Sequence, residues 1–88
     1  MPKVRLKIDN RRGLHARAAA KFVKLANLYN VEVIVTKDGQ SVSGKSIMGL
    51  LMLAAMPGDK IILETKGLQA QEALSVLSSL VNQKFEER

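Results

Sequence analysis

Segments with two different hydrophobic periods alternate along this chain, and this alternation constrains its fold more than any other feature. In residues 4–8 and again in residues 31–35, apolar side chains occupy every second position, which is the period of a half-buried strand. Residues 60–65, which contain the apolar run Ile61-Ile62-Leu63, predict a further strand. Asp38-Gly39 is a two-residue hairpin signal, so residues 40–43 are expected to form a short return strand.

Helical patterns fill the intervals between these strands. Residues 14–26 are rich in alanine, a strong helix former. Ser46 is a suitable N-cap for an apolar helix over residues 47–55, which Pro57-Gly58 is expected to end. Residues 69–85 carry apolar side chains at amphipathic helical spacing. The predicted order βαββαβα places the helices on one face of an antiparallel or mixed sheet.

Composition limits the classes of protein to which an 88-residue chain can belong. The length suits a single domain, residues 1–88, and 47% hydrophobic and 25% charged residues are typical of a folded domain. With no cysteine and one histidine, we expect no disulfide framework and neither a thiolate nor a histidine-rich metal site. No metal and no cofactor is assigned to the chain. The apolar residues 47–57 fall far short of the ~20 residues that span a bilayer. Residues 4–8 alternate and so do not form the core of a signal peptide, which makes the cytoplasm the expected location.

Positive charge is concentrated at one end of the sequence. The formal net charge is +6; residues 1–24 hold eight basic residues and one acidic residue, whereas residues 25–88 hold six and seven. The excess surrounds the only histidine, His15, and predicts a partner that is acidic, nucleic acid included. A basic nucleic-acid-binding module is therefore the alternative function, although three aromatic residues are few for base stacking.

His15 falls where a loop meets a helix, within the sequence Gly-Leu-His-Ala-Arg of residues 13–17. The first backbone N–H groups of the helix, those of Ala16, Arg17 and Ala18, should lack carbonyl partners and form an anion site with the helix dipole. Arg17 can add a bidentate grip on phosphate oxygens, and nearby positive charge favours the neutral, nucleophilic imidazole. The pattern suits phosphoryl transfer to His15. The alternative is an exposed histidine that happens to begin a helix.

Residues 39–46 match the nucleotide-binding pattern G-x-x-x-x-G-K-[ST] letter for letter, and a predicted helix follows them. Their context contradicts a nucleotide site, because a phosphate-binding loop follows a buried parallel strand. Here the hairpin signal at Asp38-Gly39 assigns residues 40–43 to a strand. We therefore interpret the match as coincidental.

Ser46 begins a helix that is too apolar to have only one hydrophobic side. As an N-cap, Ser46 stabilises the helix by about 1 kcal/mol, and beside Lys45 it is also a suitable phosphorylation point. Leu50 and Leu53 are expected to face the sheet. The alternative to an exposed docking patch is a helix that the core covers fully. The residues assigned to the patch are Ile47, Met48 and Leu51.

Residues 13–17, together with Lys-Ser-Ile-Met-Gly-Leu at residues 45–50, resemble the HPr family, the histidine-containing phosphocarrier proteins of the bacterial phosphotransferase system. The resemblance extends over essentially the whole chain, and two motifs at matching spacing make it specific. It implies an α+β fold, an open-faced β-sandwich with a four-stranded antiparallel sheet covered on one face by three helices. Ala18 departs from the proline of many members, and the alanine-rich residues 16–23 are similar to the nitrogen-related NPr branch.

The resemblance implies a carrier in sugar uptake or nitrogen-related regulation, not an enzyme. His15 would accept a phosphoryl group on Nδ1 from phosphorylated enzyme I and pass it to an EIIA domain, with Arg17 stabilising the group. Ser46 matches the serine that HPr kinase/phosphorylase phosphorylates. Neither a membrane nor a specific nucleic acid is expected as a partner, and the simplest state is a monomer. The expected partner surface comprises Arg12, Leu14, Ala20, Lys21, Lys24, Lys45, Ile47, Met48 and Leu51.

The basic residues near His15 are expected to act by electrostatic steering. Arg5 and Lys7 lie on a predicted strand and are interpreted as its solvated face. The others should attract a phosphoryl group and an acidic docking surface, with Lys45 approaching His15 through the fold. The residues assigned to this role are Arg11, Arg12, Arg17, Lys21, Lys24 and Lys45.

Overall fold

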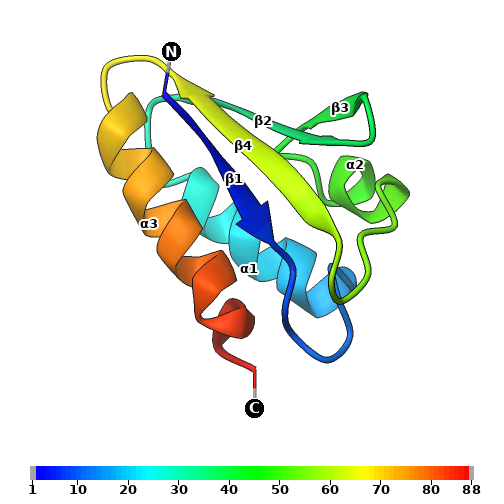
Figure 1. Ribbon diagram of the computed structural model, residues 1–88. Helices are drawn as coiled ribbons and strands as arrows, with labels where there is room; N and C mark the ends of the chain where they lie inside the picture. The colour runs from blue at the N-terminus through cyan, green and yellow to red at the C-terminus, as the bar shows by residue number, and fades with distance from the viewer. Residues whose placement is uncertain (1, 88) are drawn as a thin grey trace.

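A four-stranded sheet and three α-helices make up the computed structural model, which describes residues 2–87 (Figure 1). The strand order is β1-β4-β2-β3, and every neighbouring pair is antiparallel. The predicted order of elements is confirmed, and the sheet is antiparallel rather than mixed. The elements are β1 (Lys3–Lys7), α1 (Ala16–Ala26), β2 (Glu32–Lys37), β3 (Gln40–Ser43), α2 (Ile47–Met52), β4 (Lys60–Lys66), α3 (Ala70–Asn82) and a 3-10 turn (Lys84–Glu86).

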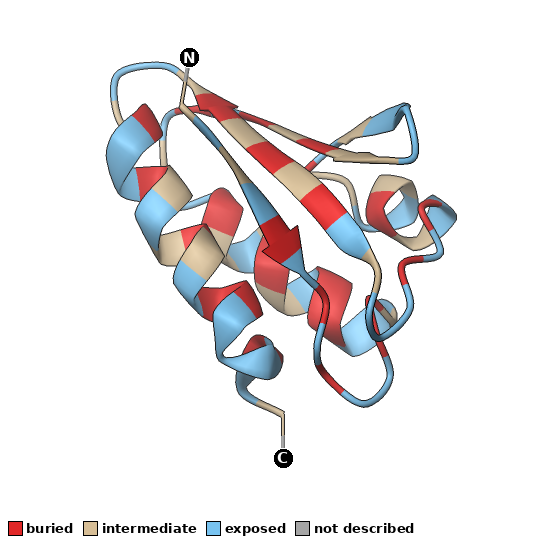
Figure 2. Cartoon of the chain, in the orientation of Figure 1, coloured by how far each residue is buried: buried red, intermediate tan, exposed pale blue. Residues whose placement is uncertain are grey.

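The helices lie on one side of the sheet, as expected for an open-faced sandwich (Figure 1). Along β4 the buried Ile61 and Leu63 alternate with the half-buried Ile62 and Glu64, because successive side chains of a strand point to opposite faces. Figure 2 shows the same alternation in colour, with the buried positions of the helices turned toward the sheet. A single hydrophobic core therefore separates the sheet from the helices, and Phe22 of α1 lies at its centre with 1% of its surface exposed.

The hairpin between β2 and β3 forms where the sequence predicts it. Asp38 and Gly39 have φ angles of 50° and 81°, and a two-residue hairpin turn of this kind requires positive φ at both positions. Residues 40–43 pair with β2, from Lys37 opposite Gln40 to Ile34 opposite Ser43. Residues 40–43, half of the segment that matches the nucleotide-binding pattern, therefore form a strand, and the predicted strand assignment is confirmed.

Helix α2 ends at Met52 and not at residue 55, so the predicted boundary is wrong. Ala54 adopts a left-handed conformation with φ of 52°, which turns the chain out of the helix. Ala55 then turns into the core, where 2% of its surface is exposed, and its carbonyl oxygen accepts a hydrogen bond from Leu14 N–H at 2.9 Å. Docking against the loop before α1, rather than the following Pro57, decides where α2 ends.

Helix α3 ends at Asn82, three residues before the predicted boundary at residue 85. Lys84, Phe85 and Glu86 follow it with φ angles of 58°, 55° and 62°. Three consecutive left-handed residues without glycine cost about 1–2 kcal/mol each, so contacts elsewhere must hold them. Phe85, which is fully buried, supplies one of these contacts.

Candidate functional site

His15 is the N-cap residue of α1, as predicted, with extended backbone angles of φ −86° and ψ −179°. Its carbonyl oxygen accepts the first helical hydrogen bond, from Ala19 N–H at 2.8 Å. Gly13 has a φ of 67°, and a Cβ atom there would collide with the carbonyl of Ala55. Leu14, assigned to the partner surface, is instead buried, and anchors the loop below His15. The loop therefore fixes the histidine backbone at the start of the helix.

The first turn of α1 is open to an anion. The His15 side chain makes no capping hydrogen bond, and the turn contains no acidic residue. Among the hydrogen bonds of residues 2–87, none is donated by the N–H groups of Ala16, Arg17 or Ala18. Three free donors at the positive end of an 11-residue helix can bind a phosphate-sized anion beside the imidazole.

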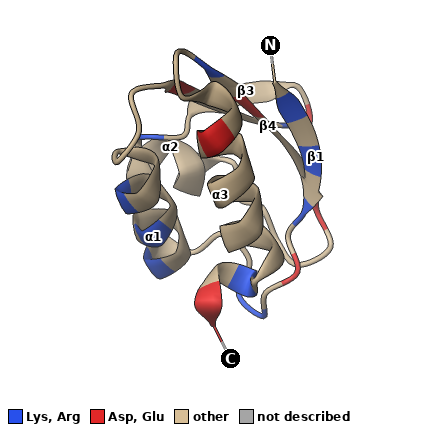
Figure 3. Cartoon of the chain, turned by 90° about the vertical axis from the view of Figure 1, so that its left-hand side faces the viewer, with Lys and Arg blue, Asp and Glu red and all other residues tan. Residues whose placement is uncertain are grey.

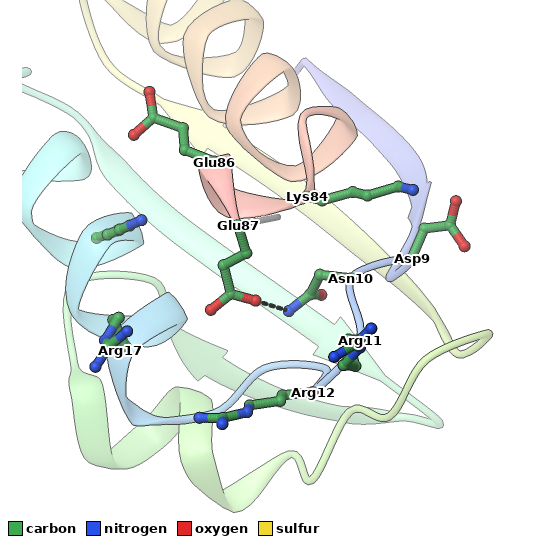
Figure 4. Close-up of a pocket in the computed structure, with 9 residues that line it drawn as sticks. Asp9, Asn10, Arg11, Arg12, Arg17, Lys84, Glu86 and Glu87 are labelled. Atoms are coloured by element: carbon green, nitrogen blue, oxygen red, sulfur yellow. Dashed lines mark hydrogen bonds between the residues drawn. The ribbon is translucent and has the colours of Figure 1, made fainter.

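A carboxylate from the other end of the sequence contacts the imidazole. Glu87 Oε2 is paired with His15 Nε2, 72 residues away along the chain. Glu87 Oε1 accepts a hydrogen bond from Asn10 Nδ2 at 2.8 Å, drawn as the dashed line in Figure 4. Positive charge near His15 is expected from the sequence, but this carboxylate is not. No sequence motif indicates this contact, because it depends on how the chain folds after α3.

Asn10 is the buried centre of this contact, with 1% of its surface exposed. Its Nδ2 also donates to the carbonyl oxygen of Gly13 at 2.7 Å, which ties the loop before His15 to the segment after α3. The hydrogen bond from Asn10 is the main cause that lowers the pKa of the Glu87 carboxyl below its ordinary value of 4.5. His15 and Lys21 lower this pKa further, against the opposing effect of burial. Glu87 is therefore held as a carboxylate.

The left-handed turn over residues 84–86 delivers Glu87 to His15. The buried Phe85 side chain packs in the main core, and Lys21 Nζ donates to the Phe85 carbonyl oxygen at 2.9 Å. Within the turn, Glu87 N–H donates to the carbonyl oxygen of Lys84 at 3.0 Å. A lysine of α1 and an aromatic anchor thus hold the turn against the helix that carries His15.

Most of the basic residues assigned to the site do come together, in an open cleft of about 750 Å³ beside α1. Figure 3 shows basic positions along α1, and acidic positions beside a basic one in the segment after α3; Figure 4 shows how side chains of both segments line the cleft. Carboxylates share the cleft with them, so it is mixed in charge and not uniformly basic. The lining residues are Asp9, Asn10, Arg11, Arg12, Arg17, Lys21, Lys84, Glu86 and Glu87.

Lys45 does not approach His15, and that expectation is wrong. Its Nζ donates to the carbonyl oxygen of Tyr29 at 3.1 Å, beyond the C-terminal end of α1, whereas His15 lies at the N-terminal end. An 11-residue helix is about 16 Å long, so the charge of Lys45 is well separated from the imidazole. Lys24 and Ala20 are exposed on α1, and Lys24 lines a second hollow with Leu28.

Ser46 is the N-cap of α2, as predicted, and its Oγ accepts a hydrogen bond from Gly49 N–H at 3.0 Å. Ile47 and Met48 beside it are exposed, with 40% and 68% of their surface accessible. Leu51 is half-buried against the core and contributes less to the patch than expected. Two exposed residues that are not predicted from the sequence extend the apolar surface: Met52 and Met56.

The buried positions of α2 face the core as predicted. Leu50 and Leu53 have 1% and 4% of their surface exposed. The alternative in which the core covers the whole helix is wrong, because Met48 and Met52 remain exposed. Among residues 2–87, no group of three potential metal-ligating side chains is found, and no helix is long and apolar enough to cross a membrane.

The fold and the site define a small α+β domain that presents a histidine at an open helix N-terminus. The family model described as "PTS HPr component phosphorylation site" matches residues 2–83. The phosphocarrier protein HPr of Pseudomonas aeruginosa is 49% identical to this chain, over 99% of this chain and 98% of its own length. The phosphocarrier protein NPr of Shewanella violacea is 41% identical, over 91% of this chain and 88% of its own.

The solved structures agree with the sequence comparisons. HPr-C-His from Thermoanaerobacter tengcongensis superposes with a TM-score of 0.96 at 39% identity, covering 100% of this chain and 99% of that one. HPr from Bacillus anthracis superposes with a TM-score of 0.85 at 40% identity, covering 89% and 93%. This chain belongs to the HPr family of phosphocarrier proteins of the phosphotransferase system, with the open-faced sandwich of that family.

Proposed function

We propose that His15 accepts a phosphoryl group on Nδ1 from phosphorylated enzyme I and passes it to an EIIA domain. The observation that carries this proposal is the position of His15 at the start of α1, next to three N–H groups that donate no hydrogen bond among residues 2–87. Membership of the phosphocarrier family supports the same role. Because both partners are proteins, the chain is a carrier between them and does not turn over a small substrate alone.

The geometry supports a direct transfer. The Nδ1 lone pair attacks phosphorus, the bond from phosphorus to the donor breaks, and the N–H groups of Ala16, Arg17 and Ala18 are placed to receive the phosphoryl oxygens. The exposed guanidinium of Arg17 adds charge to oxygens that the helix dipole already favours. Among the hydrogen bonds of residues 2–87 none engages Nδ1, so this nitrogen is free to react.

The test is incubation of the purified protein with phosphoenolpyruvate and enzyme I. We expect an acid-labile, base-stable phosphohistidine, with ³¹P and ¹⁵N NMR assigning the phosphoryl group to Nδ1 of His15. The control is His15→Ala, which should fold, as its circular dichroism would show, and accept no phosphoryl group. Phosphorylation of the His15→Ala variant, or none of the native protein, would contradict the proposal.

A second proposal concerns Ser46, which we infer to be a regulatory phosphorylation site for a kinase of the HPr kinase/phosphorylase type. The exposed Met48 and Ile47 beside Ser46 support it, because a phosphate there would place charge against an apolar docking patch. The N-terminus of α2 tolerates the charge, so the helix should survive modification. Incubation with such a kinase and ATP should label native protein and leave Ser46→Ala unlabelled.

The branch of the family is a separate proposal. Relatives named HPr and NPr both match, and the residue at position 18 is alanine. We infer that the protein works in the cytoplasm as a monomer, in sugar uptake or in nitrogen-related regulation. Transfer from phosphorylated His15 to purified EIIA domains of each branch separates the two roles. Light scattering at working concentration separates a monomer from the dimer described for the HPr-like protein Crh of Bacillus subtilis.

A further inference from the structure

We propose that Glu87, held in place by Asn10, is a positioning residue that fixes the tautomer of His15 for phosphoryl transfer. This inference rests on the proposed role of His15 as acceptor. It concerns the contact between Glu87 Oε2 and His15 Nε2 and its connection to Asn10.

The orientation of each group follows from its neighbour. The carbonyl oxygen of Gly13 can only accept, so the Asn10 side chain must turn its NH₂ group toward Gly13. The same NH₂ group donates to Glu87 Oε1, which leaves Oε2 as the atom that faces His15. A carboxylate only accepts hydrogen bonds, so Nε2 must carry a proton. In the neutral ring the lone pair is then on Nδ1, the nitrogen proposed to attack phosphorus.

The fold holds this arrangement at a cost. Asn10 Oδ1 is buried without a hydrogen-bond partner among residues 2–87, and such a group is unfavourable in a folded protein. Lys84, Phe85 and Glu86 are all left-handed, which is also unfavourable. Backbone outliers of this kind persist only where the surroundings enforce them, and they cluster at functional sites. Both features lie within the connection that places Glu87 against His15.

The carboxylate also matches the charge that develops during transfer. When Nδ1 forms its bond to phosphorus, the bond to the donor breaks and the ring keeps the Nε2 proton, so positive charge develops on the imidazole. Glu87 stabilises that charge through the Nε2–H group without taking the proton. When the phosphoryl group leaves for an acceptor, the Nδ1–P bond breaks and the ring returns to the same neutral tautomer.

The decisive variant is Glu87→Gln. Because Asn10 still presents its NH₂ group, the new side chain must turn its carbonyl oxygen to Asn10 and its own NH₂ group to His15. That group donates to Nε2 and moves the ring proton to Nδ1, which removes the nucleophilic lone pair. We therefore expect phosphoryl acceptance to slow by more than about tenfold, as a wrong tautomer does in other histidine sites.

Two further variants separate positioning from simple loss of charge. In Glu87→Ala, water can replace Glu87 as the partner of His15 Nε2, and no group forces the proton onto Nδ1. The variant loses only the partly exposed contact between Glu87 and His15, so phosphoryl acceptance should slow by less than about fivefold. Glu72→Gln removes the same charge from an exposed side chain of α3 that does not line the cleft, and should match native protein. The predicted order, with Glu87→Gln slower than Glu87→Ala, is one that a merely structural role of Glu87 would not produce.

The spectroscopic readout is ¹⁵N NMR of the imidazole at a pH where the ring is neutral. Native protein should have its proton on Nε2, and Glu87→Gln should shift it toward Nδ1. If the native tautomer persists in Glu87→Gln, or if the two Glu87 variants transfer at the rate of native protein, the inference is wrong. If native protein accepts no phosphoryl group, the proposed function fails, whereas the tautomer measurement still decides the positioning role.

Discussion

Helices α1 and α2 begin alike, at an N-cap residue with extended backbone, but only α2 closes its own first turn. The Ser46 side chain accepts a hydrogen bond from Gly49 N–H, whereas the His15 side chain makes no capping bond. Serine is among the preferred N-cap residues, and histidine is not one of them. The difference teaches that α1 lacks the stabilisation that a capping side chain gives and leaves its first N–H groups available, whereas the side chain at the α2 terminus stabilises its own helix.

The largest expected effect comes from giving α1 the cap that α2 has. His15→Ser should abolish phosphoryl acceptance and still fold, because serine supplies about 1 kcal/mol of capping that offsets the lost contact with Glu87. Urea unfolding and ³¹P NMR measure the two quantities. The matched variant His15→Ala should be less stable than His15→Ser by about 1 kcal/mol. A Ser variant no more stable than the Ala variant would show that the terminus of α1 is closed in another way.

The next effect separates the two roles of Ser46. Ser46→Asp keeps an acceptor at the N-cap and adds charge beside the exposed Met48, so we expect KM for enzyme I to rise on the order of tenfold with little loss of stability. Ser46→Ala should leave KM unchanged and lower the free energy of unfolding by about 1 kcal/mol. Transfer kinetics and thermal unfolding measure both. Equal KM values for the two variants would remove the docking role of this surface.

A smaller effect tests the charges around the open helix terminus. Arg12→Gln removes an exposed charge from the cleft, so transfer from enzyme I should slow by about threefold at low salt. Added salt should slow native protein steeply and narrow the gap between the two. Arg5→Gln is the control, because Arg5 is exposed on β1 and does not line the cleft. A similar slowing in both variants would mean that only net charge matters.

The smallest effect is in the pH dependence of stability. The hydrogen bond from Asn10, with His15 and Lys21, lowers the pKa of Glu87 in the folded protein. The carboxylate therefore contributes stability above its ordinary value of 4.5, and this contribution is lost as pH falls through the lowered folded-state pKa. The difference in unfolding free energy between native protein and Glu87→Gln should shrink on acidification. A gap that stays constant or grows would contradict the lowered pKa.

The features that could be predicted from the sequence are those with local causes. The alternation of residues 4–8, the turn at Asp38-Gly39 and the cap at Ser46 depend on neighbours in the chain, and each forms as predicted. The place of His15 at the start of α1 is also local, because Gly13 and the alanine-rich helix define it. The sequence pattern is compatible with an antiparallel or a mixed sheet, and the strand pairing in the structure shows that the sheet is antiparallel.

The errors have a common physical origin in long-range contacts. Helix α2 ends early where Ala55 docks on the loop before α1, and the segment after α3 turns left-handed where Phe85 enters the core. The sequence does not show which group Lys45 contacts. In the folded protein its Nζ donates a hydrogen bond to the Tyr29 carbonyl oxygen. Periodicity and capping rules use only neighbouring residues in the chain. They therefore do not predict where contacts with distant residues end a helix.

By itself the sequence determined the order of the elements and the place of His15 before α1, because a histidine in front of a helix without a capping side chain is a local arrangement. Only the tertiary structure decided what faces the other side of the ring. Glu87 lies 72 residues from His15 along the chain, and it reaches the imidazole through Asn10, the Phe85 anchor and the hydrogen bond from Lys21. A hydrogen bond is formed between atoms that are near in space, and the packing of α3 and its following turn against α1 brings these atoms together.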